Sequence, residues 1–353
     1  MPIEKIDIDY FLSLSKQLPI LDVRSPAEYN HAHIPSAFSM PIFTDEQRAI
    51  IGTAYVRQSR RVAVDHGLNY FSERMKIIPG EVIQIVNEWQ NNTGLGASGA
   101  EGLLIHCWRG GMRSEAVAWL LSLYGNRIFL LNGGYKAFRK WVLAQFEKKY
   151  SLKVLGGFTG SGKTEVLKEL RRSGKRIIDL EALANHKGSA FGALGEYSQP
   201  AHEMFENLLA VELWKAVDNG DEEIWLEDES VHIGKVGIPK VFWEQMRQSP
   251  IFFMDIPFDE RLSYITKTYG VFGKEKLAEC IFKIHKRLGG LDTKNAIRLL
   301  SENKIRDSFA ILLTYYDKFY EKGLQKRENI SSLLNKVSCK NVSVTNAEKL
   351  NNT

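Results

Sequence analysis

The chain has 353 residues, more than one ordinary hydrophobic core accommodates, and this length favours two domains. Hydrophobic residues make up 44% and charged residues 25%, as in soluble globular proteins, and no apolar stretch is long enough to cross a bilayer. The net charge of +5 permits a nucleic-acid partner without requiring one.

Targeting and cysteine patterns predict a cytoplasmic protein. The first 20 residues carry acidic side chains and no small-residue cleavage site, so we predict no signal peptide. The three cysteines, Cys107, Cys280 and Cys339, have neither the spacing of a disulfide framework nor that of a metal site. We therefore expect a reducing, cytoplasmic environment, no membrane association, no tightly bound cofactor and no firmly predicted metal.

In the first half of the chain, strand and helix signals alternate. Strands are predicted at residues 19–24, 102–107 and 127–134. Helices are predicted within residues 44–92 and at 114–125 and 135–150. Ser114 is a plausible N-cap of the second of these helices, and Gly125 is its stop. Such alternation favours a parallel sheet covered on both faces.

The pattern restarts after residue 150. Strands are predicted at 152–157, 175–181, 223–230 and 250–257, and residues 273–328 read almost entirely as helix. The last residues are polar and predict a loose or short-stranded tail. We therefore divide the chain into domains at residues 1–148 and 149–330 and a polar C-terminal tail at 331–353.

The stretch HCWRGGMRS places Cys107 between an apolar strand and a glycine pair. Backbone N–H groups of a glycine loop that opens a helix form an anion cradle, to which the helix dipole adds. A thiol in such a cradle, flanked by arginines, should favour the thiolate that a nucleophile or a sulfur carrier needs. A buried structural cysteine is the alternative. The predicted cradle comprises Arg109, Gly110, Gly111, Met112 and Arg113.

The same loop resembles two families. HCWRGGMRS fits the signature of protein tyrosine phosphatases, and it also resembles the active loop of rhodaneses, whose cysteine carries a persulfide. The flanking sequences LDVRSPAEYNHAHIPSA and LNGGYKAFRKW resemble rhodanese signatures, and no phosphatase W-P-D loop is visible. The loop to Arg113 is one residue longer than in most rhodaneses, so a wider cradle could seat phosphate or selenophosphate. His106, the last strand residue, is a tempting base but is more often a packed histidine.

A second glycine loop, GGFTGSGKT, contains the phosphate-loop pattern between a strand and a helix. Its N–H groups would wrap a diphosphate, Lys163 would neutralise phosphate charge, and Thr164 could ligate Mg²⁺. The predicted diphosphate site is Gly157, Thr159, Gly160, Ser161, Gly162, Lys163 and Thr164. Candidate Mg²⁺ or substrate ligands are Asp179, Glu227 and Asp228, although solvated acids at strand ends are an equal alternative. The pattern does not say which diphosphate binds or whether a nucleotide does.

Three short basic clusters stand out from the mildly basic balance. They are VRQSRR (56–61), RRSGKR (171–176) and KIHKR (283–287). For any single cluster a solvated surface is the favoured interpretation, but together they predict that RNA would bind mainly through its backbone charge.

The combination of HCWRGGMRS, LNGGYKAFR, GGFTGSGKT, DLEALANHKGSAFG, WLEDES and RLGG resembles the tRNA 2-selenouridine synthase family from about residue 10 to 330. The resemblance implies an α/β fold: a rhodanese-like parallel-sheet domain with a helical insertion, then a P-loop α/β domain with a helical C-terminal part. It also implies a transferase acting on wobble 2-thiouridine of tRNA, first with geranyl diphosphate and then with selenophosphate. Cys107 matches the family's catalytic cysteine, taken to carry selenium as a selenyl-sulfide. A selenophosphate-producing enzyme is a further candidate partner.

Two other functions remain open from the residues alone. The phosphate loop and Cys107 would also suit an ATP-dependent sulfurtransferase or kinase acting on a small molecule. The spacing of the cysteine loop would suit a phosphatase-like or anion-sensing module.

Overall fold

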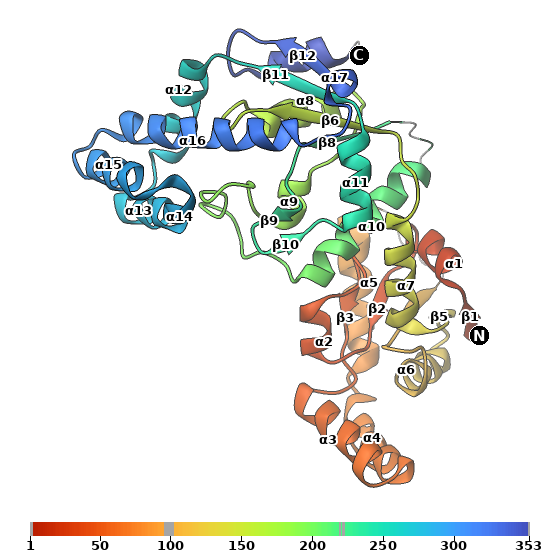
Figure 1. Ribbon diagram of the computed structural model, residues 1–353. Helices are drawn as coiled ribbons and strands as arrows, with labels where there is room; N and C mark the ends of the chain where they lie inside the picture. Colours follow the sequence, from red (N-terminus) through yellow and green to blue (C-terminus); the bar gives the residue numbers. More distant parts are fainter. Residues whose placement is uncertain (1–2, 95–101, 219, 221–222, 352–353) are drawn as a thin grey trace. The chain divides into compact units, whose positions relative to one another are not determined.

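The computed structural model describes residues 3–94, 102–218, 220 and 223–351 and consists of two compact units, Met1–Ala144 and Gln145–Thr353 (Figure 1). The division falls a few residues before the expected boundary near residue 148. Each unit contains a five-stranded parallel sheet, so the predicted α/β fold class is confirmed.

The first unit has the strand order β1-β5-β4-β2-β3. Its strands β4 and β5 are entirely buried and, apart from His106, apolar, which is typical of a parallel sheet with helices on both faces. Leu21, Ile105 and Leu130 of the sheet share a core with Val82 and Val117 of two helices. The elements are β1 (Ile3–Ile6), α1 (Ile8–Leu14), β2 (Ile20–Asp22), α2 (Pro26–His31), β3 (Phe38–Ser39), α3 (Asp45–Arg57), α4 (Arg60–Arg74), α5 (Ile78–Thr93), β4 (Leu103–His106), α6 (Met112–Leu123), β5 (Ile128–Leu131) and α7 (Gly134–Phe146).

The predicted helices of residues 44–92 are α3, α4 and α5, inserted between β3 and β4. Thr44 and Ser59 cap the first two of them by accepting hydrogen bonds from Gln47 N–H and Val62 N–H, both at 3.2 Å. α3 and α4 pack against each other as a helical hairpin. The expected helical insertion is therefore present.

The second unit has the strand order β12-β11-β6-β8-β7, also parallel throughout. One core of this unit lies beneath α8 around Leu155, Trp225 and Met254, and another lies among α12, α13, α15 and α16. The elements are β6 (Leu152–Gly157), α8 (Lys163–Arg172), β7 (Arg176–Ile178), α9 (Leu180–Ala184), α10 (His202–Asp218), β8 (Ile224–Glu227), β9 (His232–Ile233), β10 (Val236–Gly237), α11 (Lys240–Gln248), β11 (Ile251–Asp255), α12 (Phe258–Tyr269), α13 (Lys274–Lys283), α14 (His285–Leu288), α15 (Gly290–Ser301), α16 (Ile305–Gln325), α17 (Ile330–Leu333), β12 (Leu334–Ser338), η1 (Val344–Ala347) and α18 (Glu348–Asn351).

The expected tail at residues 331–353 belongs to this second fold. β12 pairs with β11 from Leu334 to Ser338, and Cys339, Ala347 and Leu350 are buried in the core beneath α8. Of the two alternatives, a loose or a short-stranded tail, the structure confirms the short-stranded one, because a polar edge strand needs only one apolar face to join a sheet.

Candidate functional site

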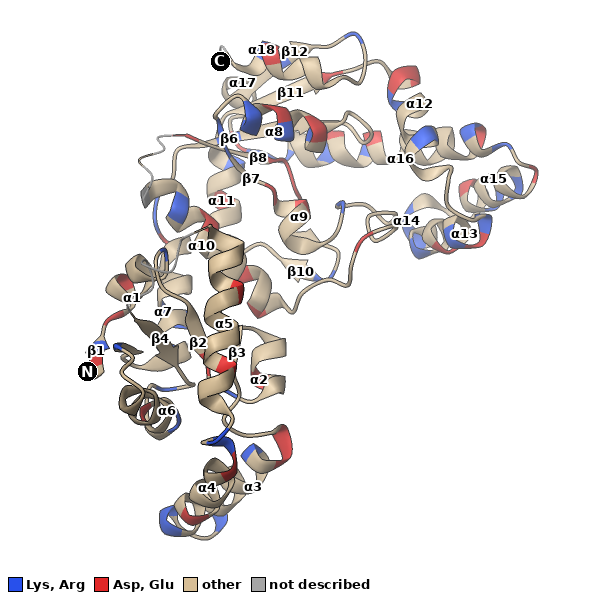
Figure 2. Cartoon of the chain, turned by 180° about the vertical axis from the view of Figure 1, so that it is seen from behind, with Lys and Arg blue, Asp and Glu red and all other residues tan. Residues whose placement is uncertain are grey.

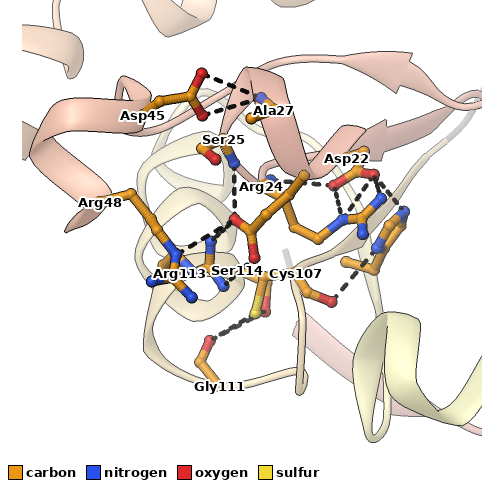
Figure 3. Close-up of polar contacts among 12 residues, drawn as sticks. Asp22, Arg24, Ser25, Ala27, Asp45, Arg48, Cys107, Gly111, Arg113 and Ser114 are labelled. Carbon is orange, nitrogen blue, oxygen red and sulfur yellow. Dashed lines mark hydrogen bonds and ion pairs between the residues drawn. The ribbon is translucent and has the colours of Figure 1, made fainter. Parts of the chain in front are cut away.

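The cysteine loop, residues 107–113, joins β4 to α6 and carries one buried sulfur (Figure 3). Cys107 is only 4% exposed. The backbone N–H groups of residues 108–114 donate no hydrogen bond to any residue that the structure describes. Seven consecutive unsatisfied donors at the start of a helix are the expected form of an anion cradle.

A second turn, after β5, holds the cysteine loop in place. Tyr135 N–H and Lys136 N–H donate to the carbonyls of Cys107 and Trp108 at 2.8 and 3.0 Å. Gly110 has φ +66°, and a Cβ built there would lie 2.5 Å from the carbonyl oxygen of Leu131. This contact explains why the glycines of LNGGYK and of the cysteine loop occur together: the two backbones approach too closely for side chains.

The sulfur has two short-range polar neighbours. The Ser114 hydroxyl lies 3.3 Å from Cys107 Sγ and 3.0 Å from the carbonyl of Gly111, and Cys107 Sγ is 3.9 Å from that same carbonyl. Ser114 therefore lies inside the helix. The prediction that it caps the helix is wrong, because Gly111 occupies the cap position. A hydroxyl donor at this position can stabilise negative charge on sulfur.

The two arginines of the loop have different surroundings. Arg113 Nη1 is 2.7 Å from Glu28 Oε2, and Arg48 Nε is 3.9 Å from the same oxygen. Burial raises the pKa of Glu28, but the hydrogen bonds and charge of Arg113 outweigh it and the pKa is lowered overall. Arg109 and Met112 are exposed. The residues of the predicted cradle thus lie in one loop whose donors are backbone N–H groups. Glu28 holds the Arg113 side chain at the edge of this loop, and the Arg109 side chain is exposed to solvent.

Beneath the loop lies a buried ion pair. Arg24 Nη2 is 2.6 Å from Asp22 Oδ2, and its guanidinium lies 3.8 Å from the centre of the Tyr135 ring. His106 is fully buried with Nε2 3.6 Å from the same Asp22 oxygen, and burial lowers the pKa of its imidazole. Among the described residues, its Nδ1 has a polar contact with the Cys107 carbonyl oxygen alone, at 3.4 Å, so His106 has the surroundings of a packed histidine and not of a base for the thiol.

The phosphate loop, residues 157–164, joins β6 to α8 in the second unit. Gly160 and Gly162 have φ +80° and +71°, which side chains tolerate poorly. Within the described chain, the N–H groups of Thr159, Gly160, Gly162 and 163–165 donate to no acceptor. Lys163 Nζ instead donates to the carbonyl of Gly157 at 3.1 Å, inside its own loop.

Three neighbouring segments brace the phosphate loop. Arg261, buried on α12, donates to the Thr159 carbonyl at 3.1 Å and pairs with Asp317 of α16 at 2.7 Å. A Cβ at Gly160 would lie 2.6 Å from Ile265, and one at Gly162 would lie 2.7 Å from Val342. The residues predicted to bind a diphosphate therefore form one braced turn, and the C-terminal segment is part of its support.

Carboxylates lie behind this loop. Thr164 Oγ1 donates to Glu181 Oε2 at 3.1 Å, and Glu181 N–H donates to Glu227 Oε1 at 2.6 Å. Glu227 is 2% exposed and its Oε2 has no hydrogen-bond partner in the described chain. Burial first and neighbouring carboxylates second raise the pKa of Glu227 and of Glu229 well above the ordinary value, whereas Lys163 moderates the burial effect on Glu181.

Two of the predicted Mg²⁺ or substrate ligands have other partners. Asp179 caps α9 by accepting from Ala182 N–H at 2.8 Å. Asp228 forms an ion pair with the buried Arg327 and accepts from Tyr320 Oη at 2.7 Å. Asp228 nevertheless lines the cavity beside the loop, whereas Asp179 does not; two further acids, Glu181 and Glu229, line it as well. The sequence signal for them was weak, because an acid one residue further along is equally compatible with a strand end.

A cavity of about 1090 Å³ extends from the phosphate loop within the second unit. Lys163 and Thr164 lie at one part of its lining, together with Glu181 and Glu229. Its lining also includes an aromatic set from α12 and α16: Tyr264, Tyr269, Tyr316, Phe319 and Tyr320. The cavity therefore combines anion donors with a large apolar surface.

Comparison with known families defines the class of each unit. A model described as a rhodanese-like domain matches residues 7–140, and one described as the tRNA 2-selenouridine synthase AAA domain matches residues 150–349. The chain therefore combines a rhodanese-like domain with an AAA-type phosphate-loop domain.

Relatives align with nearly the whole chain. The tRNA 2-selenouridine synthase of Sulfurovum sp. (strain NBC37-1) is 32% identical over 90% of this chain and 91% of its own. The enzyme of that name from Pseudomonas fluorescens (strain Pf0-1) is 33% identical over 89% and 91%, and that from Hydrogenovibrio crunogenus is 32% identical over 91% and 93%. The chain belongs to the tRNA 2-selenouridine synthase family, which confirms the resemblance drawn from its motifs.

None of the helices in the described residues is both long and apolar enough to span a membrane.

Proposed function

We propose that the protein is a tRNA 2-selenouridine synthase that replaces sulfur by selenium in wobble 2-thiouridine in two steps. The observation that carries the proposal is the pairing of a phosphate loop with an aromatic cavity in one unit and a separate cysteine loop in the other. A prenyl diphosphate has an anionic and an apolar part, and this cavity offers donors for the first and aromatic surface for the second.

In the first step the geranyl group moves from geranyl diphosphate to the thiouridine sulfur. The C1–O bond to pyrophosphate breaks, a C1–S bond forms, and the base loses its N3 proton. Lys163 and the unsatisfied N–H groups of the phosphate loop stabilise charge on the departing pyrophosphate. The aromatic residues of α12 and α16 pack against the geranyl chain and keep water from the allylic carbon.

Mg²⁺ is compatible with the residues beside this loop. Thr164 Oγ1 and Glu181 Oε2 are 3.1 Å apart and would hold the ion together with phosphate oxygens. The described residues contain no group of three or more His, Cys, Asp or Glu side chains suited to bind a metal by themselves. Bound Mg²⁺ would supply further positive charge to the pyrophosphate.

In the second step selenium replaces the geranylated sulfur. The N–H groups of residues 108–114 would hold the selenophosphate anion, and the Cys107 thiolate would attack its phosphorus. The P–Se bond breaks, the departing selenium takes a proton from water as hydrogen selenide, and water then hydrolyses the S–P bond to phosphate and free thiolate. The selenium of hydrogen selenide adds to C2, geranylthiolate leaves, and the selenium-bound proton moves to N3. Alkylation matters because a thioether sulfur leaves as a thiolate, which is a better leaving group than sulfide.

A cross-over experiment tests the division of labour. Lys163→Ala should abolish geranylation of 2-thiouridine tRNA. Loss of a side chain that stabilises developing negative charge raises the activation free energy by about 3 kcal/mol, which is roughly a hundredfold in rate. Given tRNA that is already geranylated, this variant should still install selenium. Cys107→Ser should do the reverse and accumulate geranylated tRNA. Lys276→Ala, at an exposed position outside the cavity lining, and Cys280→Ala are matched controls that should behave as wild type.

Nucleoside mass analysis of both variants on both substrates gives the readout. If folded Cys107→Ser also failed to geranylate, the two sites would not be separable and the proposal would be wrong. If the wild type bound ATP tightly and did not respond to geranyl diphosphate, an ATP-dependent sulfurtransferase or kinase would replace it.

A further inference from the structure

The tip of the α3–α4 hairpin carries charges that no part of the described chain neutralises. Arg57 ends α3, and Arg60 and Arg61 begin α4 after a two-residue turn. All three side chains are exposed, and none forms an ion pair with a described residue. Asp65, one helical turn after Arg61, makes no such pair with it either.

Two of these arginines stand where a helix disfavours them. The first turn of a helix has the positive end of the macrodipole, so acids are stabilising there and cations are not. α3 follows this rule with Asp45 and Glu46 in its first turn, but α4 begins with Arg60 and Arg61 and has no acid in its first turn. A local rule broken without an internal gain is typical of a functional surface.

Apolar side chains stand beside the charges. Tyr55 is 56% exposed and Val56 is 83% exposed, both in the last turn of α3 (the hairpin is drawn with its charges in Figure 2). An exposed aromatic ring next to arginines can stack on an unpaired base while the guanidinium groups bind phosphates in a bidentate manner. An acidic protein partner would pair with the arginines but would not explain the exposed Tyr55 ring.

The hairpin is connected to the cysteine loop through α3. Arg48, near the start of α3, lies 3.9 Å from Glu28, and Glu28 holds Arg113 of that loop. Nine residues separate Arg48 from Arg57, which at the helical rise is about 14 Å. This distance corresponds to about four stacked nucleotides along one nucleic-acid strand. An RNA whose base reaches the cysteine loop could therefore place neighbouring phosphates at the tip.

We propose that this tip, defined by Tyr55, Val56, Arg57, Arg60 and Arg61, is an RNA-docking surface that binds the backbone and an unpaired base of the anticodon arm. The inference rests on the proposed function, which supplies tRNA as the substrate. It assigns a binding role to one of the three basic clusters and to the helical insertion of the rhodanese-like unit.

The test measures tRNA affinity of the full chain with arginines 57, 60 and 61 all changed to Gln. We expect roughly 10- to 100-fold weaker binding at low salt, and a salt dependence whose logarithmic slope falls by about one unit per arginine removed. Tyr55→Ser should weaken binding about tenfold with an unchanged slope, because it removes stacking and no charge. The control changes Lys294, Arg298 and Lys304 to Gln; it removes the same charge from a region where Arg298 and Lys304 already pair with Glu302.

Thermal stability separates docking from a structural role. Arg60→Gln and Arg61→Gln relieve an unfavourable dipole interaction, so we expect a melting temperature equal to or above that of wild type. Equal tRNA affinity and equal slope in the triple variant would overturn the inference while leaving the proposed function intact. Loss of binding to the selenophosphate-producing enzyme, with tRNA affinity unchanged, would assign the surface to a protein partner instead. If wild type bound no tRNA at all, the proposed function itself would fail.

Discussion

The cysteine loop and the phosphate loop use the same backbone device and differ in the side chains around it. Each follows a parallel strand, opens a helix and leaves consecutive N–H groups without acceptors in the described chain. In the first, Cys107 lies at the base and Arg113 is held by Glu28. In the second, Lys163 lies inside the loop and buried carboxylates stand behind it.

This difference shows which part of a glycine loop determines binding and which determines chemistry. Backbone donors at a helix start attract an anion whatever the side chains are. In the proposed function, a soft nucleophile would equip one loop to handle a chalcogen, and a lysine beside carboxylates would equip the other to release a diphosphate. The predictions below disturb one loop while the other serves as its internal reference.

The largest effect is expected from ending the chain at Ile330. This truncation removes β12, which pairs with β11, together with the buried Cys339, Ala347 and Leu350 and the Val342 contact at Gly162. Three buried side chains and an edge strand together contribute a large share of a stability of about 5–15 kcal/mol. The second unit should therefore fail to fold and to bind diphosphate.

The cysteine unit should be unaffected by that truncation, as judged by its own thermal transition and by alkylation of Cys107. A chain ending at Asn351 is the control. Diphosphate binding by the shorter chain at wild-type strength would show that the C-terminal segment does not support the loop.

Gly110→Ala should disrupt the opposite loop. Its added Cβ would lie 2.5 Å from the Leu131 carbonyl at a backbone φ of +66°, so either the loop or the β5 turn must move. We expect a loss of about 3 kcal/mol in the free energy of unfolding of the first unit. Gly111→Ala is the matched control, since a Cβ there meets nothing within 4 Å. Equal melting temperatures of the two variants would contradict the close-approach argument, and diphosphate binding should be normal in both.

Glu227→Gln should change how stability depends on pH. The pKa of Glu227 is raised in the folded state, chiefly by burial, above its unfolded value of about 4.5. Its contribution to stability is therefore fully present below the unfolded pKa and is lost as the pH rises through the folded pKa. The variant should be more stable than wild type at pH 8, with the advantage shrinking toward pH 4.

Melts of both proteins across that range give the comparison, and Glu260→Gln, at an exposed position, is the control. A constant difference between variant and wild type at all pH values would show that the carboxyl does not titrate in this way. The first unit's transition should follow the same pH course in all three proteins.

Much of this architecture could be predicted because glycine patterns and apolar runs report local requirements. GGFTGSGKT and HCWRGGMRS fixed the positions of both loops between their strands and helices, since positive φ values and close backbone approach admit few residues other than glycine. The strand β12 could be predicted only as one of two alternatives for the tail, because only some of its side chains face a core, and a five-residue run of mixed polarity also occurs in loops.

Side-chain partners at the sites were harder to predict than the loops. Arg113 is paired with Glu28, which is 85 residues away in the sequence, and Asp228 with Arg327, which is 99 residues away. Such pairs depend on how distant elements pack and leave no local pattern. For the same reason, Asp179 caps a helix, whereas the carboxylates that line the cavity beside the phosphate loop are Asp228, Glu181 and Glu229.

The smallest effects are expected at the other two cysteines, and they test whether the chemistry is confined to the cysteine loop. Cys280 and Cys339 are buried, and burial raises the pKa of both thiols. Each packs in a hydrophobic core of the second unit, so replacement by Ala should cost about 1 kcal/mol of stability and leave selenation unchanged. Iodoacetamide should modify Cys107 first in the native protein, because its sulfur lies 3.3 Å from the Ser114 hydroxyl in a loop whose N–H groups have no acceptor in the described chain, whereas the other two thiols must lose a proton in an apolar core. Mass analysis of alkylated peptides at early times gives the order. Preferential labelling of Cys280 or Cys339, or loss of selenation in either Ala variant with its fold intact, would remove the functional distinction between the cysteine loop and the rest of the chain.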